Sequence, residues 1–389
     1  MGFTDLILLV TRGVPMRVLF VSSPGLGHIF PTVPLAHALT ASGHEVLYAQ
    51  GGDVGSVAAA GVNVVDVTPG LDYATVFRPE EIDFSVDGGD EFVSALFAKV
   101  SGVTVDRVLE VARSWSPDLI VHSPLQGAGP LAAGALGVPA VSVVTGPADS
   151  APRIDGLLRD HMKEHYLRHG VAPEPAPGIR LNSMPRSLLE LLPEQVRGAD
   201  DVPVRYVPYN GNGELPGWLL EPPRRPRIAV TLGSIAGLWG GLAVLAPLVA
   251  AAADTDAEFV VTLGGGDPSL LGELPPNVTT VDWLPLAPLL AVCGGLIHHG
   301  GSGTTAVAMA LGVPQCVMPL SPDQKDNERA VVERGIAVGA AAETVGTAEF
   351  RALLEDDGMR RAAAEVRDET AAMPSPAALV GRLEALVSS

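Results

Sequence analysis

The sequence predicts an α/β protein with two doubly wound, parallel-sheet domains of the Rossmann type. The chain has 389 residues, whereas one domain usually has about 100 to 200. Short, continuously apolar segments alternate with Ala/Leu-rich segments, as expected for buried parallel strands and the helices that cover them. The pattern starts again after a Gly/Pro/Asn-rich stretch in the middle of the chain. We therefore expect two similar domains facing each other across a cleft.

Each half of the chain supplies its own elements. The first half predicts strands at Arg17–Ser22, Glu45–Ala49, Leu119–His122 and Ala140–Val144, and helices at Val33–Ala41 and Gly127–Leu136. The second half predicts strands at Ile228–Leu232, Phe259–Leu263, Val278–Asp282, Gly295–His298 and Gln315–Met318. A last helix near Pro376–Val387 is expected to cross back to the first domain.

The expected boundaries follow from composition. Residues 1–15 form an extension before the first convincing strand, and its apolar stretch is too short for the signal-peptide core of about 7 to 15 residues. Domains at 16–208 and 227–389 are joined by a linker at 209–226, where Gly, Pro and Asn prevent a continuous helix or central strand. Residues 68–92 are acidic and aperiodic, which predicts a substrate-facing loop.

Composition excludes several classes of protein. The net charge is −19, with only three lysines, so nucleic acid is not an expected partner. No apolar run approaches the roughly 18 residues of a membrane-spanning helix. Cys293 and Cys316 lie in apolar surroundings without a CxxC motif, which indicates reduced thiols and a cytoplasmic protein. The oligomeric state is left open, a homodimer included.

The first motif is "FVSSPGLGHIFPTVPLAHAL", residues 20–39, in which an apolar strand runs into a glycine turn. A dinucleotide site would need a third glycine where Phe30 stands, and an acid where the second strand ends in Gln50-Gly51-Gly52. An NAD(P) site is therefore disfavoured. A turn at the carboxyl edge of a parallel sheet still faces the ligand crevice, so His28 is expected in the cleft. The alternative is a structural or helix-capping histidine.

The second motif is "LIHHGGSGTTAVAMALGVPQCVMPLSPDQKDNERA", residues 296–330. An apolar strand ends in His298-His299, and Thr304-Thr305 open an Ala-rich helix after the glycines. Free N–H groups at a helix N-terminus, hydroxyls and an imidazole can together hold a diphosphate. A glycine turn with capping threonines would explain the glycines, but not the paired histidines.

The segments "GLGHIFP", "DWLPLAPLL", "HHGGSGTT" and "SPDQKDN", in this order and at these separations, carry a resemblance to a known family. Over nearly all of residues 16–389, the chain resembles the inverting natural-product glycosyltransferases of the plant and antibiotic type, which have the GT-B fold. It is most similar to actinomycete enzymes that glycosylate polyketide and enediyne aglycones, the calicheamicin type included. The resemblance implies an N-terminal acceptor domain and a C-terminal nucleotide-sugar domain.

The resemblance also implies a role for individual residues. His28 would be the general base, and Trp283 the platform on which the nucleotide base stacks. The diphosphate would be held by Ser234, His299, Ser302, Gly303 and Thr304, and the donor sugar by Asp323 and Gln324. The reaction would be the metal-independent, inverting transfer of a deoxysugar from a TDP-sugar to a hydroxyl of a hydrophobic aglycone in antibiotic biosynthesis, without a cofactor.

Two positions depart from the family pattern. Ser123 in "LIVHSPLQG" stands where many relatives have an Asp that orients the base, so His28 is expected to be oriented by a hydroxyl, by water or by the acceptor. Val307 stands where plant members carry a ribose-binding Glu, which argues against the UDP contacts of the plant enzymes.

Two other patterns suggest metal sites that we do not expect. "DTD", residues 254–256, precedes a strand and so lies at the amino edge of the sheet, away from the ligand side. His161, His165 and His169 recur every four residues, but one helical stripe seldom supplies converging zinc ligands, so a polar helix near the acceptor is preferred.

Three alternative functions remain open at this point. A sugar-nucleotide 2-epimerase of the same fold would need further acidic groups. An NAD-dependent reductase is weakened by Phe30 and the missing acid. A catalytically silent sugar-nucleotide-binding protein would keep His299 and Thr304 but have no use for His28.

Overall fold

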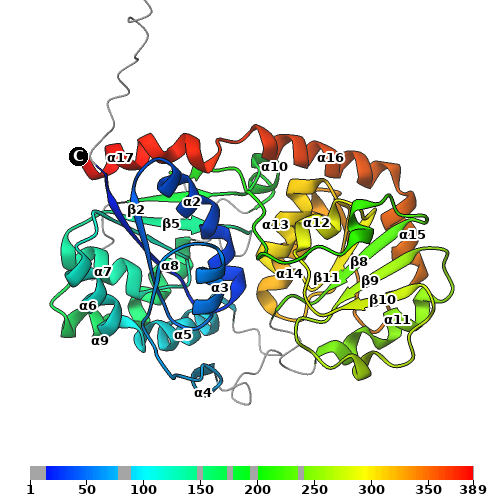
Figure 1. The fold of residues 1–389 in the computed structure, drawn as a ribbon, viewed down its shortest axis with the longest axis horizontal. Coiled ribbons are helices and arrows are strands. Elements are labelled where there is room, and N and C mark those ends of the chain that lie inside the picture. The colour runs from blue at the N-terminus through cyan, green and yellow to red at the C-terminus, as the bar shows by residue number, and fades with distance from the viewer. Residues whose placement is uncertain are drawn as a thin grey trace, which may run out of the picture.

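Two parallel β-sheets organise the molecule, one in each half of the chain (Figure 1). The structure is a computed structural model, and it describes residues 15–77, 89–146, 152–172, 178–192, 200–234 and 241–388. Within these residues, the first sheet has seven strands in the order β3-β2-β1-β4-β5-β6-β7, and the second has six in the order β10-β9-β8-β11-β12-β13. Both orders are doubly wound, which confirms the predicted α/β class with two Rossmann-like sheets.

The first half contributes these elements. Its strands are β1 (Arg17–Val21), β2 (Glu45–Gln50), β3 (Val64–Asp66), β4 (Leu119–His122), β5 (Ala140–Val144), β6 (Gly178–Asn182) and β7 (Val202–Pro203). Its helices are α1 (Leu26–Ile29), η1 (Phe30–Thr32), α2 (Val33–Ala41), α3 (Val54–Ala59), α4 (Ala74–Phe77), α5 (Gly89–Gly102), α6 (Val105–Trp115), α7 (Ala128–Leu136), α8 (Pro152–His161), α9 (Lys163–Arg168) and α10 (Arg186–Leu189).

The second half contributes a similar set. Its strands are β8 (Arg227–Thr231), β9 (Glu258–Thr262), β10 (Val278–Val281), β11 (Gly295–His298), β12 (Gln315–Val317) and β13 (Ala337–Gly339). Its helices are η5 (Gly217–Leu220), η7 (Gly241–Leu245), α11 (Ala246–Ala252), η8 (Pro268–Leu271), α12 (Leu286–Leu290), α13 (Ser302–Leu311), α14 (Pro322–Glu333), α15 (Thr347–Glu355), α16 (Asp357–Ala372), η9 (Pro376–Leu379) and α17 (Val380–Ser388).

Each sheet is buried on both faces, as the apolar strands require. In the first sheet, alternate residues of β1 point to opposite faces: Phe20 joins the core that α2 covers, and Leu19 joins the core of α6 and α7. In the second sheet, Ile228 packs toward α11 and α15, and Ala229 packs toward α13, α14 and α16. The two faces thus form two cores in each half.

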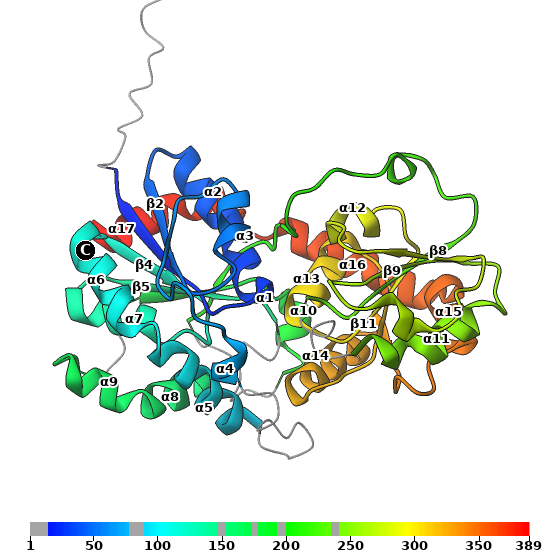
Figure 2. The ribbon, with the colours of Figure 1, turned by 60° about the horizontal axis from the view of Figure 1, so that its bottom comes forward.

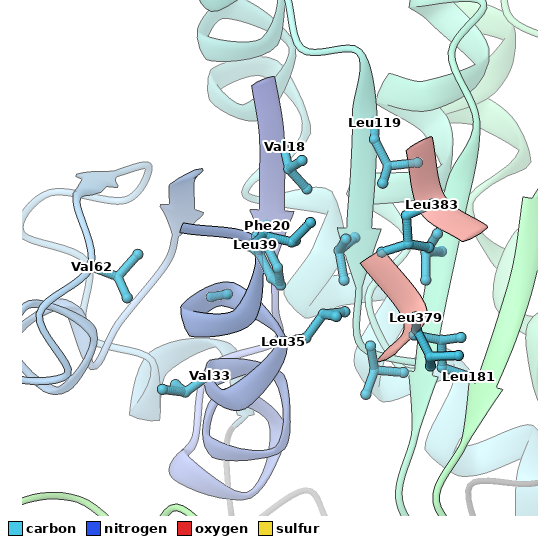
Figure 3. Close-up of a cluster of buried hydrophobic side chains, with 14 of the residues drawn as sticks. Val18, Phe20, Val33, Leu35, Leu39, Val62, Leu119, Leu181, Leu379 and Leu383 are labelled. Carbon is cyan, nitrogen blue, oxygen red and sulfur yellow. The ribbon is translucent and has the colours of Figure 1, made fainter. Parts of the chain in front are cut away.

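The C-terminal segment returns to the first half. After α16 the chain crosses over, and Leu379 and Leu383 pack into the core of the first half, on the side of Leu119 and Leu181 (Figure 3). Two polar contacts hold this segment: the Arg205 N–H donates to the Pro374 carbonyl at 2.8 Å, and His44 Nε2 lies 3.3 Å from Glu384 Oε1. The tail therefore fastens the two halves together.

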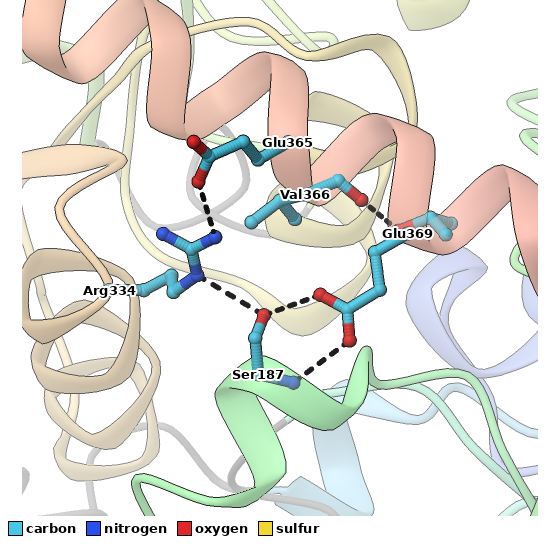
Figure 4. A network of polar contacts seen from close by, with 6 residues as sticks. Ser187, Arg334, Glu365, Val366 and Glu369 are labelled. Carbon is cyan, nitrogen blue, oxygen red and sulfur yellow. Dashed lines mark hydrogen bonds and ion pairs between the residues drawn. The ribbon is translucent and has the colours of Figure 1, made fainter.

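A short helix of the first half packs in the opposite direction, against the second half. Leu188 on α10 belongs to the apolar core of α13 and α16. At its N-terminal end, the Ser187 N–H and Oγ donate to the Glu369 carboxylate at 2.9 and 2.6 Å (Figure 4). Arg334 Nε donates to Ser187 Oγ at 3.1 Å, and its Nη2 donates to Glu365 at 3.1 Å. Residues near 187 therefore pack with the second half, although the strands on either side belong to the first sheet.

Several expected elements differ from the structure. All nine predicted strands are present within one or two residues, but β3, β6, β7 and β13 were not expected because they are short or, as in "GIRLN" of β6, mix polar and apolar residues. The expectation that 68–92 is an aperiodic loop is wrong at both α4 and the start of α5. Residues 78–88 and most of the 1–15 extension lie outside the described residues.

Candidate active site

The His28 turn lies at the carboxyl edge of the first sheet, directly after β1. Gly25 has φ +104°, a backbone conformation that favours glycine, and its N–H donates to Asp53 Oδ2 at 2.8 Å. The His28 N–H then donates to the Gly25 carbonyl at 3.0 Å, which begins the single turn of α1. His28 is half-buried, and Figure 2 shows α1 on the side of the first half that faces the second.

Ser123 fixes the approach to this turn. Its buried Oγ accepts a hydrogen bond from the Ser23 N–H at 3.2 Å, and Ser23 Oγ donates to the Leu125 carbonyl at 2.6 Å. The loop after β4 is thereby tied to the chain just before Gly25. This contact gives Ser123 a role in holding the turn, which the sequence did not suggest.

We expect Ser123→Ala to destabilise the protein with little change in turnover. The substitution leaves the buried Ser23 N–H without its acceptor, a loss that typically costs about 1–3 kcal/mol of folding free energy. Thermal unfolding and kcat of the same preparation test this. A fall in kcat as large as that of a His28 variant would show that the hydroxyl acts in catalysis.

On the second half, His298 and His299 differ sharply in environment. His298 is fully buried at the end of β11: its Nδ1 accepts the Gly300 N–H at 3.1 Å, and its Nε2 lies 3.0 Å from Gln315 Oε1. Burial lowers the pKa of His298 to about 3, the adjacent His299 acts in the same direction, and the Gln315 hydrogen bond opposes them. His298 is thus a neutral side chain that shapes the glycine loop, a role that sequence reasoning missed.

We expect acid to destabilise the fold through His298 and His122. Burial lowers the pKa of His122 to about 4, so both imidazoles stay neutral in the folded state. An unfolded histidine takes up a proton near pH 6.5. The stabilisation is therefore complete above about pH 6.5 and is lost as the pH falls toward 4, by up to about 1.4 kcal/mol per pH unit for each histidine. Denaturant unfolding from pH 8 to 4.5 measures this, and an equally steep slope in His298→Asn would contradict it.

The His299 imidazole lies between two glycines, Gly233 after β8 and Gly301 in the loop between β11 and α13. A Cβ on Gly233 would be 2.8 Å from His299 Cε1, and a Cβ on Gly301 would be 2.5 Å from Nε2. Both glycines are needed for the imidazole to lie this close to the backbone, and Gly233 also has φ +71°. The ring therefore lies between the turn after β8, where Ser234 follows Gly233, and the start of α13.

The N-terminus of α13 presents free backbone donors. Gly301 is its N-cap residue and, among the residues that the structure describes, no side chain caps it. Asn327 is buried and clamps the loop, donating to the Gly300 carbonyl at 2.8 Å and to Ser302 Oγ at 3.2 Å. Ser302, Gly303 and Thr304 form the half-buried first turn. Such a helix start attracts anions through its N–H groups and its dipole.

The other predicted donor residues lie near this loop or beside the segment between β7 and β8. Trp283 follows β10 and is 45% exposed, and a Cβ on Gly211 of that segment would be 3.5 Å from its indole ring. Gln324 lies in the first turn of α14 beside Gly300, and its Oε1 accepts the Leu320 N–H at 2.8 Å. The side chain of Asp323 lies outside the described residues.

The two halves contact each other beside the predicted site. Gly146, two residues after β5, lies so close to Ser302 that a Cβ on the glycine would overlap the Ser302 hydroxyl. The carboxyl edge of the first sheet therefore reaches the N-terminus of α13. Tyr206, in the segment after β7, also donates from its hydroxyl to the Gly303 carbonyl at 3.4 Å.

The two metal-like patterns have other partners. Asp256 lies 3.3 Å from Arg225, in the loop before β9 at the amino edge of the sheet. His161 and His169 each lie 2.9 Å from a carboxylate, Glu91 and Asp106 respectively, so they link α8 and α9 to α5 and α6. In the described part of the chain, no three His, Cys, Asp or Glu side chains converge as a metal ion would require. None of the described helices is long and apolar enough to span a membrane.

Comparison with known proteins matches both halves to one family. Residues 37–233 match the N-terminal domain, and residues 246–386 the C-terminal domain, of the erythromycin biosynthesis protein CIII-like proteins. The chain belongs to the erythromycin biosynthesis protein CIII-like family. It is also 38% identical to the elloramycin glycosyltransferase ElmGT of Streptomyces olivaceus, over 95% of this chain and 97% of ElmGT.

Solved structures of similar proteins agree with this assignment. The glycosyltransferase SnogD from Streptomyces nogalater is 52% identical with a TM-score of 0.86, covering 96% of this chain and 100% of SnogD. The Streptomyces sp. SF2575 glycosyltransferase SsfS6, complexed with thymidine diphosphate, is 27% identical with a TM-score of 0.80, covering 95% of this chain and 99% of SsfS6. This member of the CIII-like family is a glycosyltransferase of the GT-B fold, as the sequence predicted. The 2-epimerase, the reductase and the silent binding protein find no support among these relatives.

Proposed function

We propose that this CIII-like protein transfers a deoxysugar, with inversion, from a TDP-sugar to a hydroxyl of a natural-product aglycone in antibiotic biosynthesis. The observation that carries the proposal is the contact of Gly146 with Ser302, which brings the sheet edge of His28 to the N-terminus of α13. In this proposal, the general base and the site for the departing diphosphate lie on neighbouring edges of the two halves. The thymidine diphosphate bound by SsfS6 supports the choice of nucleotide. An enediyne acceptor remains a prediction that these relatives do not test.

The proposed chemistry is a single displacement. His28 removes the proton of the acceptor hydroxyl as its oxygen attacks the anomeric carbon from the face opposite the diphosphate. The new carbon–oxygen bond forms as the bond to the diphosphate oxygen breaks, so the configuration inverts. The N–H groups at the start of α13 stabilise the negative charge that develops on the diphosphate, together with His299, Ser302 and Thr304. No cofactor enters the reaction.

The remaining residues are proposed to hold the donor. Trp283 would stack on the thymine, Ser234 would bind the diphosphate across from α13, and Asp323 and Gln324 would bind sugar hydroxyls. These local groups must supply the binding of the diphosphate, because the net charge of −19 gives the protein an overall electrostatic field that repels an anion.

The predicted domain roles fit the same scheme. We propose that residues 16–208 bind the acceptor, that 209–226 link the domains and that 227–389 bind the nucleotide sugar. A cytoplasmic location is proposed on the two cysteines, which are free, with Cys316 buried. The homodimer stays a prediction that sedimentation analysis can test.

Incubation with a panel of sugar nucleotides and aglycones tests the function. TDP- and UDP-deoxysugars are each combined with polyketide aglycones, with and without EDTA, and the products are analysed by mass spectrometry and NMR. We expect a glycoside of inverted anomeric configuration from the TDP donors, formed equally well with EDTA. Retention of configuration, or turnover of UDP donors alone, would contradict the proposal.

A further inference from the structure

We propose that Phe97 positions the His28 imidazole. The inference rests on the proposed role of His28 as the base. Phe97 lies on α5, far from His28 in the sequence, and no motif connects the two residues. The structure brings their rings together, with centroids 5.2 Å apart and planes inclined by 70°.

The ring contact has the geometry of a favourable aromatic pair. Edge-to-face arrangements place ring centroids about 4.5–7 Å apart, because the positive edge of one ring meets the negative face of the other. The inclined plane and short separation of Phe97 and His28 fit this arrangement. The phenyl ring therefore favours one orientation of the imidazole.

Phe97 is itself held from several directions. It packs against a small buried cluster of Leu125, in the loop after β4, and Ile154 of α8, and Val93 of α5 packs against the same cluster. Phe97 also contacts the larger core beneath α6 and α7. The neighbouring Ser94 and Ala98 are buried, so this part of α5 is fixed against the rest of the first half. Phe97 can thus act as a rigid support.

The same loop after β4 contacts both Phe97 and the chain that leads to His28. The Ser23 hydroxyl, two residues before Gly25, donates to the Leu125 carbonyl, and Leu125 packs in the cluster of Phe97. The hydrogen bond between Ser23 and Leu125 therefore holds both the chain before the His28 turn and the residue against which Phe97 packs. Ser123 belongs to the same arrangement, because its Oγ accepts a hydrogen bond from the Ser23 N–H.

The expected effect is moderate. Aromatic pair energies correspond to a factor of about two to twelve in the population of one ring orientation. Loss of the phenyl ring should therefore lower kcat by about three- to tenfold, whereas loss of the base itself should cost about a hundredfold or more. The KM for the donor should stay within about twofold, because Phe97 lies in the acceptor half.

The test compares Phe97→Leu and Phe97→Tyr with Val93→Ala, a cluster variant that leaves Phe97 in place. For each variant we measure kcat, the donor KM, the melting temperature and the NMR resonances of the His28 imidazole, assigned with His28→Ala. Phe97→Leu should lower kcat and shift those resonances, since the ring current is lost. Phe97→Tyr should keep kcat within about twofold of the parent enzyme.

The outcomes separate this inference from the proposed function. If Phe97→Leu and Val93→Ala lower the melting temperature alike but leave kcat and the His28 resonances unchanged, Phe97 only packs and the inference is overturned. If His28→Ala retains turnover, the proposed base is wrong, whatever the Phe97 variants show. A loss of kcat in Phe97→Leu that Phe97→Tyr restores, with His28→Ala inactive, establishes the positioning role.

Discussion

His28→Ala is expected to lower kcat by about a hundredfold or more while TDP still binds with unchanged affinity. Removal of a positioned general base usually costs a factor of about 100 to 10,000. The imidazole lies at the end of α1 on the first sheet, whereas the diphosphate is expected at α13 on the second. The substitution therefore removes the proton acceptor without removing a donor contact.

Steady-state kinetics and calorimetric titration of TDP measure the two quantities separately. His37→Ala is the matched control, because His37 lies on the neighbouring α2 and its Nε2 bonds to the Ala60 carbonyl at 2.8 Å. The control should keep kcat within about threefold. If His28→Ala has nearly the turnover of the control, another group takes the proton.

The sequence predicted the sheets well because buried parallel strands are continuously apolar. β1, with "RVLFV", and β8, with "RIAVT", are unambiguous for this reason. β6 carries Arg180 and Asn182 in polar contacts, so its pattern does not indicate a strand. The packing of α10 against the second half could not be predicted either, because a four-residue helix carries no periodicity that names its partner.

The candidate site was predictable only in part. Glycines followed by polar side chains at strand ends mark both predicted turns, and the structure places each turn at the carboxyl edge of its own sheet. The sequence could not tell which imidazole of His298-His299 faces outward, because that depends on Gln315 of the adjacent strand. The role of Phe97 could not be predicted for a related reason. An aromatic residue in a helix indicates only a core position, and its contact with His28 arises from tertiary packing.

Trp283→Ala and Thr304→Val are each expected to weaken TDP binding. A side chain of this size that is 45% exposed at the carboxyl edge of a sheet can offer a ring face to a nucleotide base. Base–aromatic stacking is worth about 1–3 kcal/mol, which is roughly 5- to 150-fold in Kd. Trp283→Phe keeps a smaller ring face and should lose less.

The Thr304 substitution tests the anion site apart from the base platform. Valine keeps the shape of threonine in the first turn of α13 but removes a hydroxyl donor, and a hydrogen bond to a charged group is worth about 1.5–3 kcal/mol. Thr279→Val, on an exposed position of β10, is the matched control and should leave the TDP affinity unchanged.

Calorimetric titration should show exothermic 1:1 binding of TDP, weakened in Trp283→Ala and Thr304→Val and not displaced by NADH. Because the helix N–H groups and His299 remain in both variants, residual binding is expected in each; unchanged affinity in both would place the nucleotide elsewhere.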